Sequence, residues 1–157
     1  MFKFKVKKLF SFFSSSPARP SSPRKRNTST MDERQEAEAD LIRLFPTMAC
    51  GKIQEMKQTL VDARNLYEPE KTKKVCSILI ELNQLKKQSI LFGYPLVCDV
   101  ATHLEKIIRN SSSFSEAKFT VMHNDILLLQ RILWKKISGD GGERGRKILN
   151  QLSRIPK

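Results

Sequence analysis

The stretch Glu81–Gly93, ELNQLKKQSILFG, lies in the middle of the chain and decides the fold. It belongs to the longest run of residues with helical apolar spacing, which predicts a helix from near Pro69 to Phe92. Proline suits the first turn of a helix, Gly93 is a C-cap candidate, and Pro95 prevents continuation. One face of this helix is therefore expected to point into a core, with the stripe Val75, Ile78, Leu79, Leu82, Leu85 and Ser89.

Similar spacing on both sides of this stretch predicts further helices at about 30–45, 47–66, 96–109, 116–137 and 143–155. The first is expected to stop before Pro46, because the residue preceding a proline disfavours the helical conformation. Ser115 is the expected N-cap of the 116–137 helix, and Gly139–Gly142 ends it. No strand alternation is evident after residue 13. We therefore predict an all-α fold, an antiparallel four-helix bundle with an extra N-terminal helix.

The apolar positions of these helices predict the rest of the core. The 30–45 helix has only a weak apolar face, formed by Ala37, Leu41, Ile42 and Leu44. The others contribute the inward-facing set Met48, Ile53, Met56, Leu60, Ala63, Val97, Val100, Ala101, Leu104, Ile107, Ile108, Phe119, Met122, Ile126, Leu129, Ile132, Leu133 and Ile137.

Charge divides the chain of 157 residues into regions. Of its 29 Lys and Arg residues, eight lie within residues 1–30, where there is no Asp or Glu, so most of the net charge of +13 is local. We predict a disordered basic tail and linker at 1–30, the bundle at 31–138 and a basic C-terminal segment at 139–157. The bundle itself is only mildly basic, which argues against a nucleic-acid-binding fold.

The tail begins with MFKFKVKKLFSFF, which mixes lysines with aromatic and aliphatic residues. This composition suits an anionic membrane surface, because aromatic rings enter the interface while lysines meet lipid phosphates. The candidate contacts are Phe2, Lys3, Phe4, Lys5, Lys7 and Lys8. An organelle-targeting segment and an inert tail remain open alternatives. We expect a cytoplasmic protein that can also be peripheral at a membrane, since no apolar run reaches the length of a span.

The chemistry-bearing residues show no metal-ligand or nucleophile pattern. Cys50, Cys76 and Cys98 are far apart and are interpreted as reduced thiols. His103 is predicted to be a half-buried structural residue and His123 a helix-surface residue. No metal, cofactor or catalytic residue is therefore predicted.

The order Asn83, Leu85, Lys86, Ser89, then Phe92-Gly93, resembles the H-x-L-K-G-x-S…(F/L)-G signature of histidine phosphotransfer (HPt) domains. The resemblance extends over roughly Leu41–Ile137 and implies a four-helix bundle. In that family the histidine accepts a phosphoryl group from an aspartyl phosphate, and the lysine attracts that group. The implied partners are a response-regulator receiver domain or a histidine kinase of a two-component system.

Two positions depart from the signature, and in that family both belong to the part of the motif where the phosphoryl group is transferred. Asn83 replaces the phosphorylatable histidine, and an amide nitrogen delocalised into its carbonyl cannot act as a nucleophile. Lys87 replaces the glycine that lets the partner backbone approach. We therefore predict a non-catalytic protein that docks a receiver domain or kinase as adaptor, scaffold or competitor. Its docking face comprises Asn83, Ile80, Lys86, Lys87 and Ile90.

Three alternatives stay open from the sequence. The first helix or the tail can cover Ile80 and Ile90, which would remove the docking face. The chain can be an active phosphotransfer protein that uses His103 instead of the motif position. It can also be an interaction protein that works through its basic aromatic tail at a membrane surface.

Overall fold

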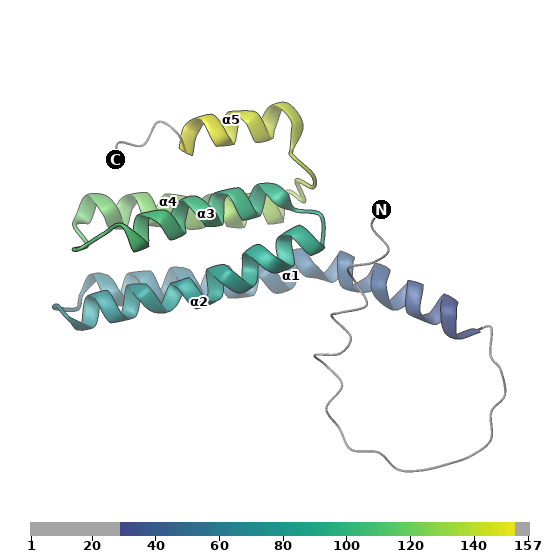
Figure 1. Ribbon diagram of the computed structural model, residues 1–157, viewed down its shortest axis with the longest axis horizontal. Coiled ribbons are helices and arrows are strands. Elements are labelled where there is room, and N and C mark those ends of the chain that lie inside the picture. The colour runs from purple at the N-terminus through teal and green to yellow at the C-terminus, as the bar shows by residue number, and fades with distance from the viewer. Residues whose placement is uncertain (1–28, 153–157) are drawn as a thin grey trace, which may run out of the picture. The chain divides into compact units, whose positions relative to one another are not determined.

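The computed structural model describes residues 29–152, and within this range the chain forms helices and no strand. The helices are α1 (Ser29–Arg64), α2 (Glu70–Leu91), α3 (Pro95–Arg109), α4 (Glu116–Trp134) and α5 (Gly142–Leu152). Short connections reverse the chain between successive helices, so that neighbours run antiparallel (Figure 1). The prediction of an all-α helical bundle is confirmed. Residues 1–28 of the predicted tail lie outside the described residues, and the last two residues of the predicted tail already belong to α1.

The predicted break at Pro46 is wrong, because α1 continues through this proline. Pro46 has no N–H to donate to the carbonyl of Ile42, and an interior proline costs a helix about 3 kcal/mol. Burial offsets this cost, since Phe45 and Ala49 on either side of the proline are core residues. The chain divides into two compact units one helical turn before the proline, one ending at Leu41 and one beginning at Ile42.

The continuous helix also explains one wrong core assignment. Met48 was predicted to face inward, but its side chain is 62% exposed. The buried stripe of α1 consists of Phe45, Ala49, Ile53, Met56, Leu60 and Ala63. This stripe starts at Phe45 and steps by four residues to Ala49, so Met48 falls on the flank of the helix.

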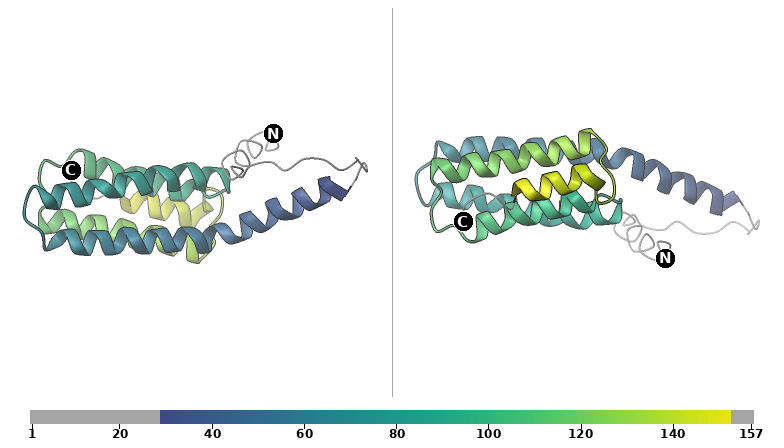
Figure 2. Two further views of the ribbon diagram at one scale, coloured as in Figure 1. Left: turned by 90° about the horizontal axis from the view of Figure 1, so that it is seen from below. Right: turned by 90° about the horizontal axis from the view of Figure 1, so that it is seen from above.

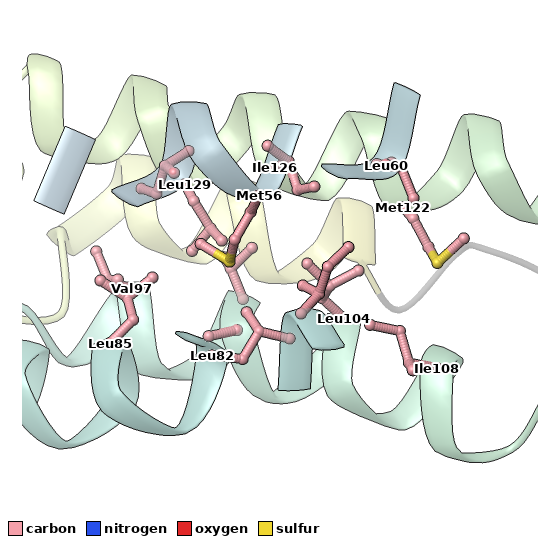
Figure 3. Packing of buried hydrophobic residues seen from close by; sticks show 14 of the residues in the cluster. Met56, Leu60, Leu82, Leu85, Val97, Leu104, Ile108, Met122, Ile126 and Leu129 are labelled. Atoms are coloured by element: carbon pink, nitrogen blue, oxygen red, sulfur yellow. The ribbon is translucent and has the colours of Figure 1, made fainter. Parts of the chain in front are cut away.

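One hydrophobic core lies between the helices of the second unit (Figure 3). The predicted stripe of α2 is confirmed, because Val75, Ile78, Leu82, Leu85 and Ser89 are buried and Leu79 packs against them. The backbones of α2 and α3 approach closely, as do those of α3 and α4. The inward residues predicted for these helices are confirmed, with Ile107 and Ile137 half-buried at the edge.

One end of the bundle is closed by contacts between α1, the α2–α3 turn and the α4–α5 connection. The ring of Phe45 stacks on Phe92 with centroids 4.7 Å apart, and it also contacts Tyr94. The N–H of Gly139 donates to the carbonyl of Gly93 at 2.8 Å. Gly93 has a φ of +82°, which an L-residue rarely adopts. The predicted stop after Phe92 therefore positions both the α2–α3 turn and the α4–α5 connection.

The ends of α4 and the placement of α5 complete the fold. Ser115 caps α4 as predicted, its Oγ accepting from the backbone N–H of Lys118 at 3.4 Å. α4 ends at Trp134, three residues before the predicted end, and Lys136 then takes a left-handed conformation with φ of +49°. α5 packs against α3, and the view from above shows it along that face of the bundle (Figure 2). Leu152 is its buried C-terminal residue.

Candidate functional site

The outward side of α2 presents the residues of the predicted docking face. Ile80, Asn83, Lys87 and Ile90 lie three or four residues apart, so they form one continuous stripe on the helix. The side chains of Ile80 and Ile90 are 63% and 50% exposed, and Asn83 between them is half-exposed. Lys87 is exposed and makes no ion pair with any other residue in 29–152. We call these four residues the α2 stripe.

Lys86, the fifth residue of the predicted face, is not part of this stripe. Its ammonium pairs with the carboxylate of Glu105 on α3, and both side chains are half-buried. Glu105 also accepts from Nε of Arg109 at 2.7 Å. Hydrogen bonds from Lys86 and then Arg109 hold the pKa of Glu105 below its ordinary value. Lys86 therefore joins α2 to α3, and Lys87 is the cation of the α2 stripe.

A depression between α1 and α2 borders the stripe at Ile80. Its lining comes from both helices and consists of Glu55, Met56, Thr59, Ser77, Ile78, Ile80 and Glu81. At this border Nζ of Lys52 donates to Glu81 at 3.0 Å. The sequence did not predict this feature, because it requires the relative placement of two helices.

A buried polar pair lies between α3 and α4. Nδ1 of His103 is 2.7 Å from Oδ2 of Asp125, which is within hydrogen-bond distance. The side chain of Asp125 is 1% exposed and that of His103 is 25% exposed. The prediction of a half-buried His103 is confirmed, but its carboxylate partner was not foreseen. A signal was present, since Asp125 lies between Met122 and Leu129 at helical spacing, where a core residue is expected.

The burial of Asp125 in this pair predicts the sign of a pH dependence of folding. Burial raises the pKa of Asp125, and the hydrogen bond from His103 lowers it by less. The folded protein therefore keeps the Asp125 proton to a higher pH than the unfolded chain does. Protonation of Asp125 therefore contributes fully to stability below the pKa that Asp125 has in the unfolded chain. This contribution is lost as the pH rises through the pKa of Asp125 in the folded protein.

We expect the Asp125→Asn variant to lose this dependence, because the amide oxygen still accepts from Nδ1–H while no charge is buried. As pH rises from about 4 to 7, wild type should become less stable relative to the variant. Each unit by which the folded and unfolded pKa values differ contributes about 1.4 kcal/mol. Urea unfolding of both proteins across this range measures the difference, and a difference that does not change with pH would contradict the assignment.

The other residues predicted from the sequence do not form a site together with the α2 stripe among the residues that the structure describes. Phe2, Lys3, Phe4, Lys5, Lys7 and Lys8 lie outside the described residues. Among residues 29–152, His103 and His123 belong to no cluster of three side chains that could hold a metal ion. Cys50 and Cys98 are half-buried and Cys76 is exposed, all as free thiols. None of the described helices has the length and apolarity needed to cross a bilayer.

Comparison of the chain with models of protein families, with curated proteins and with solved structures finds no match. The assignment of a function therefore depends on the residues and geometry described above.

Proposed function

We propose that this protein is a non-catalytic, HPt-like helical bundle that docks a receiver domain or a histidine kinase of a two-component system. It would act as an adaptor, a scaffold or a competitor for the phosphotransfer partner. The observation that carries the proposal is the exposed α2 stripe, which lies on the helix that bears the HPt-like residue order.

The stripe has the composition of a docking surface. Two isoleucines spaced ten residues apart expose apolar side chains on either side of the polar Asn83. Exposed apolar side chains with a polar rim are typical of sites that bind other proteins. Lys87 adds a positive charge that no described residue neutralises, and it would complement the acidic phosphorylation pocket of a receiver domain.

The same geometry supports binding without transfer. Asn83 occupies the position of the phosphoacceptor and lacks a nucleophilic nitrogen. Lys86 is engaged by Glu105, so the lysine that would attract a phosphoryl group already has a partner. The proposal therefore places the function in the face of the helix and assigns no step of phosphoryl chemistry to it.

A pull-down with a panel of receiver domains and kinase dimerisation domains tests the proposal. We expect wild type to retain at least one of them, and we expect Ile80→Asp combined with Lys87→Glu to reduce retention by tenfold or more, because a buried charge and a reversed charge oppose docking. Retention is measured by densitometry at several salt concentrations.

A matched control variant is Val61→Asp combined with Lys106→Glu. It makes the same changes of charge at exposed positions on α1 and α3, off the helix that bears the stripe, so it should bind like wild type. Equal retention of all three proteins, or no retention of any receiver or kinase domain, would refute the proposal.

A further inference from the structure

Trp134 is exposed to a degree that the fold does not explain. It is the last residue of α4, and its side chain is 81% exposed, whereas Ile132 and Leu133 immediately before it are completely buried. Tryptophan is the largest side chain and is highly buried on average in folded proteins. Trp134 does not belong to the hydrophobic core, and it lies on a different helix from the α2 stripe.

The surroundings of Trp134 are basic. Lys135 and Lys136 follow it directly, and Arg131 precedes it by one turn of the helix; all three are exposed. None of the three forms an ion pair with another residue in the described part of the chain. Arg144 and Arg146 on α5 add two further exposed cations close by in sequence, against Asp140 and Glu143, of which Glu143 already pairs with Lys147.

Backbone hydrogen bonds hold Trp134, Lys135 and Lys136 in place at one end of the bundle. Ile137 donates its N–H to the carbonyl of Ile132, and Gly139 is tied to Gly93 by a hydrogen bond of 2.8 Å. Lys136 takes the left-handed conformation that turns the chain away from α4. The ring of Trp134 and the two lysines are therefore presented by a connection that is anchored on both sides.

We infer that Trp134, Lys135 and Lys136 form a site that binds the surface of an anionic phospholipid bilayer. The indole ring has an apolar body and a polar N–H, so it is favoured at the boundary between acyl chains and headgroups. The neighbouring lysines and Arg131 pair with lipid phosphates, each contributing to the attraction near the surface.

A bilayer suits these observations better than a macromolecule with a fixed shape. A fluid surface requires no complementary groove, and the described depression lies on the α1–α2 side, away from Trp134. A single-stranded nucleic acid would need successive aromatic platforms, whereas Trp134 is the single aromatic residue in the basic segment 131–146. Residues 1–13 repeat the combination of aromatic and lysine residues, and stable attachment to a membrane commonly needs two such signals.

The single tryptophan makes the test direct, because all indole fluorescence of the full-length protein comes from Trp134. Addition of vesicles that contain phosphatidylserine and phosphatidylcholine should shift its emission to shorter wavelength as the ring leaves water. Vesicles of phosphatidylcholine alone should give a much smaller shift, and added salt should weaken the response. Lys135→Glu combined with Lys136→Glu should lower the vesicle partition coefficient at least roughly thirtyfold.

The control is Lys73→Glu combined with Lys106→Glu, which changes the net charge equally at exposed positions near the other end of the bundle. It should keep most of the binding and the whole spectral shift. Sedimentation with vesicles without any shift of Trp134 emission would overturn the site, because binding would then use the tail alone. Absence of sedimentation, equal losses in both variants, or a response to single-stranded DNA and not to vesicles would also overturn it. Receiver-domain retention is measured separately and tests the α2 stripe alone.

Discussion

Replacement of Leu82 by alanine should lower the free energy of unfolding by about 2–5 kcal/mol. Leu82 is completely buried at the centre of the inward face of α2, and Figure 3 shows it among side chains from several helices. Truncation removes apolar contacts and leaves a cavity that the surrounding helices fill only partly. Chemical denaturation followed by far-UV circular dichroism measures the loss.

Ile80→Ala is the matched control for this prediction. Ile80 lies two residues away on the same helix, but its side chain is 63% exposed, so its truncation should change stability by less than about 0.5 kcal/mol. Comparison of the two variants by denaturation distinguishes the buried inward face of α2 from the proposed docking face. Equal destabilisation by both substitutions would mean that Ile80 is covered and that the proposed docking surface does not exist.

Replacement of Gly145 by alanine should detach the start of α5. A Cβ atom at this position would lie 1.8 Å from the carbonyl oxygen of Asp140, which is a backbone atom and cannot rotate away. Gly145 is buried, and the turn before it is closed by a hydrogen bond from Gly142 to the side chain of Asp140. We expect a loss of about 3 kcal/mol, at the upper end of the range for overpacked sites.

Hydrogen exchange locates this effect, because residues 142–152 should lose protection while the amides of α2 and α3 keep theirs. Gly51→Ala provides the control. Gly51 lies inside α1 with nothing within 4 Å of an added Cβ, so alanine should raise stability by about 1 kcal/mol through its higher helix propensity. A stable Gly145→Ala protein with full protection of α5 would show that the close approach to Asp140 is not required.

The two substitutions also bear on the proposed sites. Leu82 supports the α2 stripe from behind, so its truncation should weaken receiver binding only as far as the bundle loosens. Gly145 supports the connection that presents Trp134, so its replacement should reduce vesicle binding and leave receiver binding intact. If Gly145→Ala lowers vesicle binding and leaves receiver binding unchanged, the two proposed binding sites act independently in separate parts of the fold.

The periodicity of apolar residues predicted most of the helices and most of their inward faces. This succeeded because a helix repeats every 3.6 residues, so the buried stripe is written directly in the spacing of Val75, Ile78, Leu82 and Leu85. Local chemistry also predicted Ser115 as a cap and Gly93 as a stop. The failure at Pro46 has the opposite cause, because tertiary burial of Phe45 and Ala49 outweighed a local preference.

The candidate sites were predictable only in part. The sequence placed Ile80 and Ile90 outside the apolar stripe of α2 but left open whether another segment covers them, and their exposure was found only in the structure. The engagement of Lys86 by Glu105 and of His103 by Asp125 depends on contacts between helices. Spacing along one helix holds no information about which residue of another helix lies opposite.

By itself, then, the sequence determined the helical class, the faces that enter the core, and the absence of a nucleophilic nitrogen in the side chain at position 83, because each of these depends on residues close together in the chain. Only the tertiary structure decided which exposed groups stay available. It assigned Lys86 to an ion pair, left Lys87 free of one among the described residues, buried the carboxylate of Asp125 and left Trp134 in solvent. The physical reason is that burial and charge pairing arise when separate helices pack, and packing brings together residues that are far apart in the chain.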